Sequence, residues 1–168
     1  MAKVITFASA CQLSSKLKKQ GKKVIWTSGF FDILHIGHVS FFSKVRKWAG
    51  PQAIIMVGVD TDQNLARTKG STRPIFIQTN RCRVLASIST IDYVVKLTEK
   101  FPREKHYIAR LQKINPTGIV FGNTGKNVLF ETSREAKKAG VSFKHLPHKI
   151  KLPSTSRIAE LIQKYYSG

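Results

Sequence analysis

The chain has 168 residues, of which 42% are hydrophobic, so it can bury a core and does not have the composition of a disordered protein. It carries 29 Lys and Arg against 9 Asp and Glu, a formal net charge of +20, which favours phosphate-bearing substrates, nucleic acid or an anionic membrane surface as partners. A solvated lysine-rich surface without a partner is the alternative interpretation. No apolar run approaches the roughly 18 to 20 residues of a membrane-spanning helix, so we expect no membrane span.

The predicted elements begin with a helix at Ser9–Gln20, where apolar residues recur at helical spacing, followed by a first strand at Val24–Trp26. Residues 1–22 are therefore expected to form an N-terminal helix that precedes the first strand. The polar segment Thr61–Pro74 is predicted to be mostly loop. The later predicted strands are Ala53–Val59, Tyr93–Val95, Gly118–Phe121 and Val141–Leu146. The later predicted helices are Gly37–Trp48, Asn80–Ser87, Pro102–Ile114, Val128–Ala139 and a closing helix, Ser154–Tyr166.

The closing helix carries an apolar stripe that is expected to be its buried side, formed by Ile158, Leu161, Ile162 and Tyr165. The alternation of strands and helices predicts an α/β fold: a Rossmann-like, doubly wound sheet of about five parallel strands in a single domain over residues 1–168. Sheets of this kind bind ligands beyond the carboxyl ends of their strands, at the point where the strand order reverses. The loops expected to form the site follow Trp26, Val59, Val95, Phe121 and Leu146.

The cysteines and the amino-terminal segment bear on the compartment. Cys11 and Cys82 form no disulfide framework and lack the spacing of a metal site, so we expect small core residues in the cytoplasm or another reducing compartment. The first 23 residues hold six lysines and no acidic residue, a composition shared with mitochondrial transit peptides, so a mitochondrial location is the alternative. Because the numbered chain starts at Met1 and has no apolar signal segment, we expect no cleaved presequence.

The stretch after the first predicted strand concentrates groups that suit phosphate chemistry, and it reads Thr27-Ser28-Gly29-Phe30-Phe31-Asp32-Ile33-Leu34-His35-Ile36-Gly37-His38. A glycine lets the backbone approach a ligand closely, and a helix amino terminus offers N–H groups and a positive dipole to a phosphate. Imidazoles can donate hydrogen bonds to phosphate oxygens while charge develops in nucleotidyl transfer. A metal site or a packed core pair would also fit two histidines at this spacing. The preceding Gly-x-Phe-Asp and the strand–loop–helix context favour the phosphate site.

This stretch resembles the His-x-Gly-His signature of the nucleotidyltransferase superfamily, which class I aminoacyl-tRNA synthetases share. Over Leu13 to Gln163 the chain looks closest to the heptose-phosphate adenylyltransferase domain, and it is more distantly similar to glycerol-3-phosphate and phosphoethanolamine cytidylyltransferases. The other segments that carry the resemblance are Gly21–Val24, Val57–Asp62, Lys69-Gly70, Arg73-Pro74-Ile75, Arg81, Leu85, Ile91–Val95 and Ser154-Thr155-Ser156-Arg157-Ile158.

The resemblance implies an enzyme that moves a nucleoside monophosphate from ATP or CTP to a sugar- or alcohol-phosphate and releases pyrophosphate, with no protein nucleophile. It implies catalytic roles for His35, His38 and Lys44, and a Mg²⁺ ion held mainly by phosphate oxygens rather than by the protein alone. Homodimers are usual among such enzymes. The residues that it implies for nucleotide and phosphate binding are Ser28, Gly29, Phe30, Gly37, Lys69, Ser154, Thr155 and Arg157, with Asp32 and Asn123 on the acceptor substrate. Ser154 is also expected to cap the closing helix.

The chain departs from the enzymes that it resembles at two places. Where they carry Gly-Asp after the fourth predicted strand, it reads Gly122-Asn123, and Lys126 follows. Where the cytidylyltransferases have an arginine about five residues before the serine, it has Lys149, a point charge with a looser grip on phosphate. These departures and the net charge favour an alternative function: a catalytically degenerate nucleotidyltransferase fold that serves as a basic subunit of a ribosome or another RNA-bound assembly.

Overall fold

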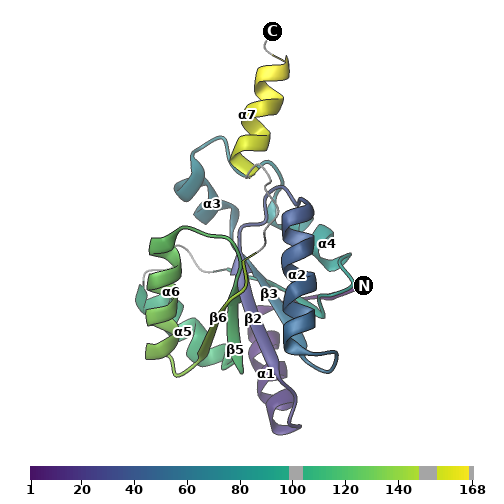
Figure 1. Ribbon diagram of the computed structural model, residues 1–168, viewed down its shortest axis with the longest axis vertical. Coiled ribbons are helices and arrows are strands. Elements are labelled where there is room, and N and C mark those ends of the chain that lie inside the picture. The colour runs from purple at the N-terminus through teal and green to yellow at the C-terminus, as the bar shows by residue number, and fades with distance from the viewer. Residues whose placement is uncertain (99–103, 148–154, 167–168) are drawn as a thin grey trace.

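The computed structural model describes residues 1–98, 104–147 and 155–166 (Figure 1). The strands in these ranges are β1 (Lys3–Thr6), β2 (Val24–Gly29), β3 (Ile54–Val59), β4 (Tyr93–Lys96), β5 (Gly118–Phe121) and β6 (Ser142–His145). The helices are α1 (Phe7–Lys19), α2 (Ile36–Ala49), α3 (Asp62–Lys69), α4 (Gln78–Ala86), α5 (Glu104–Ile114), α6 (Lys126–Lys138) and α7 (Thr155–Tyr166).

The described strands form one six-stranded parallel sheet in the order β1-β4-β3-β2-β5-β6. The predicted α/β class and the parallel sheet are thus confirmed, with one strand more than expected. The additional strand, β1, pairs with β4 at the edge of the sheet and comes before α1, so the strand at Val24 is the second and not the first. Its four residues are mostly exposed, which explains why they carry no apolar run.

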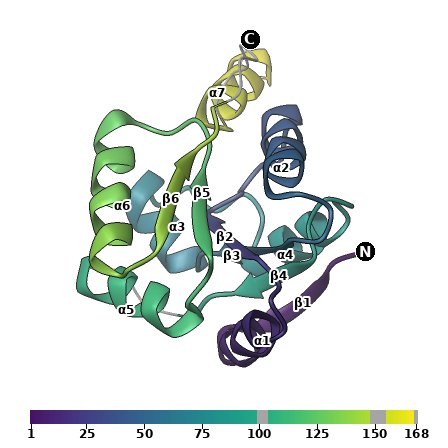
Figure 2. The same ribbon diagram turned by 60° about the horizontal axis from the view of Figure 1, so that its bottom comes forward.

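Two layers of helices cover the two faces of the sheet (Figure 2). Successive residues of a strand point to opposite faces, so Ile25 and its partner Ile55 face α2 and α4, where they pack with Phe42 and Leu85. Trp26 and its partner Met56 face α1, α5 and α6, where the other core cluster lies. Burial on both faces accounts for the continuous apolar runs of β2 and β3.

The structure corrects two further predictions. The polar segment after β3 is not mostly loop: α3 forms over Asp62–Lys69, and the Thr61 hydroxyl caps it by accepting from the Asn64 amide. The apolar stripe of α7 is not the buried side that the sequence predicts either, because α7 projects from the end of the molecule (Figure 1) and only Ile158 of the stripe is half-buried. The side chains of Leu161, Ile162 and Tyr165 are 44%, 51% and 82% exposed.

The strand order sets the place of a ligand site. From β2 the chain proceeds to β3 and β4 on one side, and then returns to place β5 and β6 on the other. The order therefore reverses between β2 and β5, so the loops that leave these two strands flank the ligand position expected for a doubly wound sheet. We call this end of the sheet the carboxyl edge and the opposite end the amino edge. Among the described helices there is none whose length and hydropathy would let it cross a bilayer.

Candidate functional site

The histidine turn lies at the carboxyl edge, between the end of β2 and the start of α2. His35 is the N-cap of α2, and its Nδ1 accepts from the Gly37 amide at 3.2 Å. In return, Nδ1 of His38 accepts from the His35 amide at 3.4 Å, so the two imidazoles form a reciprocal capping box. The ring centroids are 4.0 Å apart. The spacing of three residues therefore places both rings over the first turn of one helix.

The capping bonds fix which nitrogen of each ring carries the proton. A ring nitrogen that accepts a hydrogen bond is unprotonated, so each neutral imidazole carries its proton on Nε2. His35 and His38 therefore present two N–H donors from adjacent rings at the amino terminus of α2, where the helix dipole also favours an anion. Two neighbouring donors, on rings tilted by 37° to each other, suit the non-bridging oxygens of a phosphate chain.

The backbone donors of the turn differ from the expectation. The sequence predicts open N–H groups for a phosphate, but the Gly37 amide donates to the ring of His35 and the His38 amide donates to the His35 carbonyl at 2.9 Å. The first turn of α2 is thus already capped by its own residues. Gly37 is buried, and the amides of Gly37 and His38 are already engaged in these capping bonds.

Phe31 packs against the histidine turn and helps to hold it in place. Its φ of 52° lies in the left-handed region, which is unusual for a residue with a side chain and is often found at functional sites. The ring lies edge-on to His38 with centroids 5.5 Å apart and packs on Phe42 at 5.7 Å. A Cβ at Gly29 would come within 3.1 Å of the Phe31 ring, so the glycine at the end of β2 leaves the space that this ring needs.

Asp32 binds the chain itself in this structure. The carboxylate is 5% exposed and forms an ion pair with Arg73 at 2.7 Å. It also accepts from the amides of Ile75, at 2.9 and 3.1 Å, and Phe76, at 3.0 Å. Asp32 therefore anchors the segment that leads into α4 against the histidine turn. A direct contact between Asp32 and an acceptor substrate stays a prediction.

Arg81 joins three segments of the carboxyl edge. Its side chain is fully buried and donates to the carbonyls of Phe30, Phe76 and Asp60, the last two at 2.9 and 2.8 Å. It also pairs with the Asp62 carboxylate at 2.7 Å. The loop after β2, the start of α3 and the entry to α4 are thus held by one guanidinium, whose fixed fork of five donors suits this arrangement.

This role of Arg81 was not assigned from the sequence. The residue was noted as part of the resemblance, but its position gave no indication that a cation would be buried there. A signal was available in the spacing: Arg81 lies on the same face of a predicted helix as Leu85, which is also buried. A charged residue on the buried face of a helix is expected to bind several acceptors, since an unpaired buried charge is costly.

The loop after β5 faces the histidine turn across the reversal point. Trp26 of β2 pairs with Ile119 of β5, which brings the exits of these two strands together. Gly122 lies against α2, because a Cβ at Gly122 would come within 2.8 Å of the Phe41 ring. Asn123, the residue that replaces the expected carboxylate, follows in this loop and is exposed.

Other predicted residues lie around this centre. Ser28 is the residue before the last of β2 and lies beside the buried Tyr107 hydroxyl of α5. Burial raises the pKa of this phenol above its ordinary range, and Ser28 opposes the shift by a smaller amount. Lys44 of α2 donates from Nζ to the Pro147 carbonyl at 2.7 Å, so it joins α2 to the exit of β6. Lys69 is the exposed last residue of α3.

The predicted phosphate-binding residues near the C-terminus are described only in part. Ser154 and Lys149 lie outside the described residues, so the predicted cap of the closing helix is not observed. Thr155 and Arg157 belong to the first turn of α7, and the structure describes only their backbone.

The carboxylates of the site are not arranged to hold a metal. Asp32 and Asp62 are paired with arginines, and the Asp60 carboxylate accepts from the Asn64 side chain at 2.9 Å. In the part of the chain that the structure describes, no three His, Cys, Asp or Glu side chains are grouped as metal ligands would be. A divalent ion at this site would therefore need its ligands mainly from a bound nucleotide.

Comparison with known proteins gives matches along most of the chain. A model of the family described as cytidylyltransferase-like matches residues 26–160. The Bifunctional protein HldE of Aliarcobacter butzleri (strain RM4018) is 36% identical over 126 residues, which cover 74% of this chain and 25% of that protein. The Bifunctional protein HldE of Citrifermentans bemidjiense is 35% identical over 147 residues, covering 88% of this chain and 28% of that protein. The chain thus spans only about a quarter of the length of these relatives.

Solved structures share the fold at lower identity. The lipopolysaccharide core biosynthesis protein from Thermoplasma volcanium GSS1 has a TM-score of 0.57 at 22% identity, covering 74% of this chain and 94% of that chain. The pantoate-beta-alanine ligase from Francisella tularensis, in complex with beta-gamma ATP and beta-alanine, has a TM-score of 0.67 at 16% identity, covering all of this chain and 79% of that one. At these identities the likeness concerns the fold alone.

Proposed function

The chain belongs to the cytidylyltransferase-like family, and from this premise we propose that it transfers a nucleoside monophosphate from ATP to a sugar phosphate. In this reaction an oxygen of the acceptor phosphate attacks the α-phosphorus of the nucleotide. A new P–O bond forms, the bond from the α-phosphorus to the bridging oxygen breaks, and pyrophosphate leaves with the bonding electron pair. No protein nucleophile is needed, so the protein contributes by positioning the reactants and neutralising charge.

The observation that carries the proposal is the histidine capping box. In it, His35 and His38 each use Nδ1 to cap α2 and therefore carry the proton on Nε2. These two N–H groups would donate to the triphosphate, and the bonds would strengthen as negative charge moves onto the departing oxygens. A donor of this kind contributes roughly 10²- to 10³-fold to the rate in other enzymes that stabilise an oxyanion.

The remaining roles follow from the resemblance and are part of the proposal. Ser28, Gly29, Phe30 and Gly37 would line the nucleotide, with Asn123 across the reversal point near the acceptor. Lys44 and Lys69 would meet the phosphates, which requires Lys44 to exchange the Pro147 carbonyl for a phosphate oxygen. Ser154, Thr155 and Arg157 would form a second anion site at the start of α7.

Asp32 and Arg81 act in this proposal through the loops that they hold. Mg²⁺ would accompany the nucleotide, since the aspartates of the site are taken by other side chains. ATP is preferred over CTP because of the resemblance to the heptose-phosphate adenylyltransferase domain and the similarity to the HldE proteins.

The proposal is tested by incubating the chain with Mg²⁺, one nucleotide and one acceptor at a time. The nucleotides are ATP and CTP, and the acceptors are sugar 1-phosphates, including a heptose 1-phosphate, and glycerol 3-phosphate. We expect pyrophosphate and a nucleotidyl sugar in equal amounts from ATP and a sugar phosphate. Turnover only with CTP or only with an alcohol phosphate would overturn the substrate assignment. Absence of pyrophosphate with every pair would overturn the proposal that the chain is an enzyme. It would favour the alternative of a degenerate, basic subunit.

A further inference from the structure

The proposed reaction does not account for the net charge of +20. Many of the lysines lie far from the histidine turn, at the amino edge of the sheet. In a parallel α/β fold the helices run opposite to the strands, so the helices that cover the sheet end at this edge. The lysines in the last turn of α1 and in the segment that enters β2 form what we call the amino-edge surface: Lys16, Lys18, Lys19, Lys22 and Lys23.

Hydrogen bonds show that these lysines share one edge. Nζ of Lys18 donates to the side-chain oxygen of Asn115, which follows α5, at 2.8 Å. Nζ of Lys22 reaches the side-chain oxygen of Gln52, which follows α2, at 3.5 Å. The Lys23 carbonyl accepts from the amide that begins β3 at 2.8 Å. The surface therefore extends from α1 across the amino ends of the central strands.

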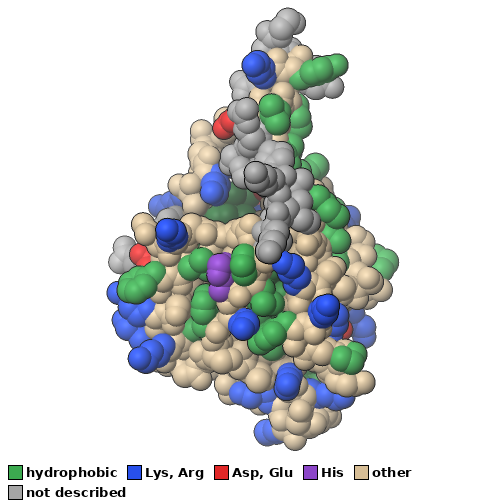
Figure 3. Space-filling view, viewed as in Figure 1, with side chains coloured by type: hydrophobic (Ala, Val, Ile, Leu, Met, Phe, Trp, Pro, Cys, Tyr) green, Lys and Arg blue, Asp and Glu red, His purple; other side chains and the backbone are tan. Residues whose placement is uncertain are grey.

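The charges of this surface are not compensated by nearby acids. The partners of Lys18 and Lys22 are neutral amides, and Lys16, Lys19 and Lys23 form no ion pair with a carboxylate among the described residues. Three ion pairs of the structure join Asp32, Asp62 and Asp92 to arginines rather than to these lysines. The last turns of α5 and α6 add further lysines at the same end of the molecule. Figure 3 shows Lys and Arg side chains gathered over this lower end, with few acidic groups among them.

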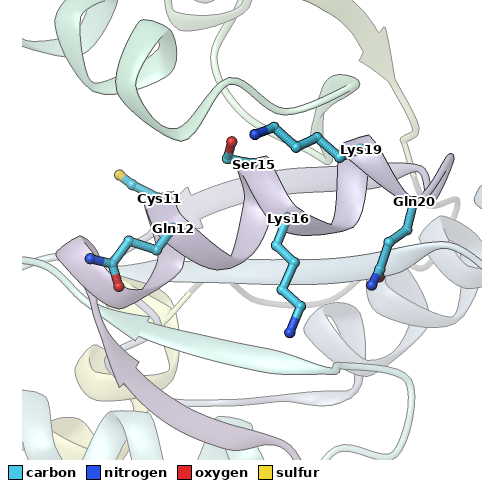
Figure 4. Close-up of a pocket in the computed structure, with 6 residues that line it drawn as sticks. All are labelled: Cys11, Gln12, Ser15, Lys16, Lys19 and Gln20. Carbon is cyan, nitrogen blue, oxygen red and sulfur yellow. The ribbon is translucent and has the colours of Figure 1, made fainter.

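The exposed side of α1 also carries an open depression of about 720 Å³ (Figure 4). Its described lining consists of Cys11, Gln12, Ser15, Lys16, Lys19 and Gln20. Ammonium, amide and hydroxyl groups are the side-chain donors that proteins use on phosphate and sugar oxygens of nucleic acids. The described lining contains no aromatic side chain on which an unpaired base could stack, which favours a duplex over a single strand. It also contains no large apolar side chain to enter a membrane, which disfavours a lipid surface.

From these observations we propose that the amino-edge surface binds the phosphodiester backbone of duplex nucleic acid. The surface lies at the opposite edge of the sheet from the histidine turn (Figure 1), so binding there leaves the nucleotide site accessible. The contacts are to phosphate and sugar, so the binding does not depend on base sequence and weakens steeply with salt. This inference does not rest on the proposed reaction.

The test measures the affinity of the whole chain for a fluorescent RNA hairpin and for a DNA duplex of the same sequence, between 0.05 and 0.2 M salt. The variant Lys16→Gln/Lys19→Gln/Lys23→Gln removes three charges of the surface and keeps good helix formers in α1. The matched control, Lys3→Gln/Lys144→Gln/Lys164→Gln, removes three exposed charges from β1, β6 and α7. Since each phosphate contact contributes about 0.9 to the salt slope, the surface variant should lower the slope by about 2 to 3 and weaken binding at least tenfold.

The control variant should bind within about twofold of the unchanged chain. Stronger binding to the RNA hairpin or to the DNA duplex identifies the source of the backbone, and either result supports the proposal. Equal losses in both triple variants would show diffuse attraction and overturn it. Tighter binding to phosphatidylserine vesicles than to either duplex would also overturn it. His35→Ala should bind both duplexes unchanged, which separates this surface from the proposed enzyme site.

Discussion

Asp32 and Arg73 form an ion pair of 2.7 Å between the loop after β2 and the segment that leads into α4, with only 4% and 10% of their side chains exposed. The two residues are 41 positions apart in the sequence. Their pairing connects the histidine turn to the next loop of the carboxyl edge, where the Asp32 carboxylate also accepts from the amides of Ile75 and Phe76.

The Asp32–Arg73 pair predicts coupling between the two residues. Asp32→Asn removes the carboxylate that pairs with a nearly buried guanidinium, so we expect a loss of roughly 3 to 5 kcal/mol in the free energy of unfolding. Arg73→Met should have a similar effect. Urea unfolding of both single variants and the double variant should give a coupling free energy of at least about 1 kcal/mol. Additive losses would contradict a shared role of the two side chains.

The Arg81 brace predicts a large difference between two arginines of α4. Arg81→Met should lower the free energy of unfolding by about 3 to 5 kcal/mol, because it removes the donor to three carbonyls and the partner of the Asp62 carboxylate. Arg83→Met, an exposed position on the same helix, should cost less than about 0.5 kcal/mol. Denaturant midpoints measure both. Similar midpoints for the two variants would show that Arg81 does not hold the carboxyl edge together.

The contact between β2 and β3 predicts a steric effect at Gly58. A Cβ at Gly58 would lie 2.6 Å from the Trp26 ring, which is fully buried and cannot move aside. Gly58→Ala should therefore destabilise the fold by about 1 to 3 kcal/mol. A Cβ at Gly125 meets no atom within 4 Å, so Gly125→Ala is the control and should cost under about 1 kcal/mol. A thermal melt in which both variants match the unchanged chain would refute the close packing of Trp26 on Gly58.

The two thiols are expected to differ in reactivity at pH 8. Burial raises the pKa of the Cys82 thiol above its ordinary value, while nearby Arg81 lowers it by a smaller amount. At pH 8 Cys82 is therefore mostly protonated as well as inaccessible, whereas Cys11 is partly exposed. A disulfide reagent should modify one thiol rapidly in the native chain and two in guanidinium. Cys11→Ser should abolish the rapid phase; its persistence would place an exposed thiolate at Cys82.

Much of the fold was predictable because the central strands are buried on both faces and read as apolar runs. β1 was missed because an exposed edge strand of four residues has no such run. α3 was missed because it is polar, although Thr61 followed by Asn64 was an available capping signal. The stripe of α7 was identified correctly as apolar, but periodicity shows only that a helix has an apolar face and not what that face contacts.

The site was predictable where one short segment carries it. The histidine turn is local, so its position could be inferred from the strand, loop and helix around it. The partners of Asp32 and Arg81 come from other loops, and only the sheet order brings these together. Sequence spacing also could not show that the histidine rings would use their own Nδ1 atoms to cap α2, which leaves the donors on Nε2.

The most direct test of the central claim is the rate of pyrophosphate release by His35→Asn, compared with the unchanged chain under the same saturating substrates. Asparagine is among the best N-cap residues and can accept from the Gly37 amide in place of Nδ1, but it has no group at the position of Nε2. We expect an unchanged unfolding midpoint and a kcat lower by roughly 10²- to 10³-fold. A variant with the same midpoint and an undiminished kcat would contradict the claim that His35 donates to the reacting phosphates.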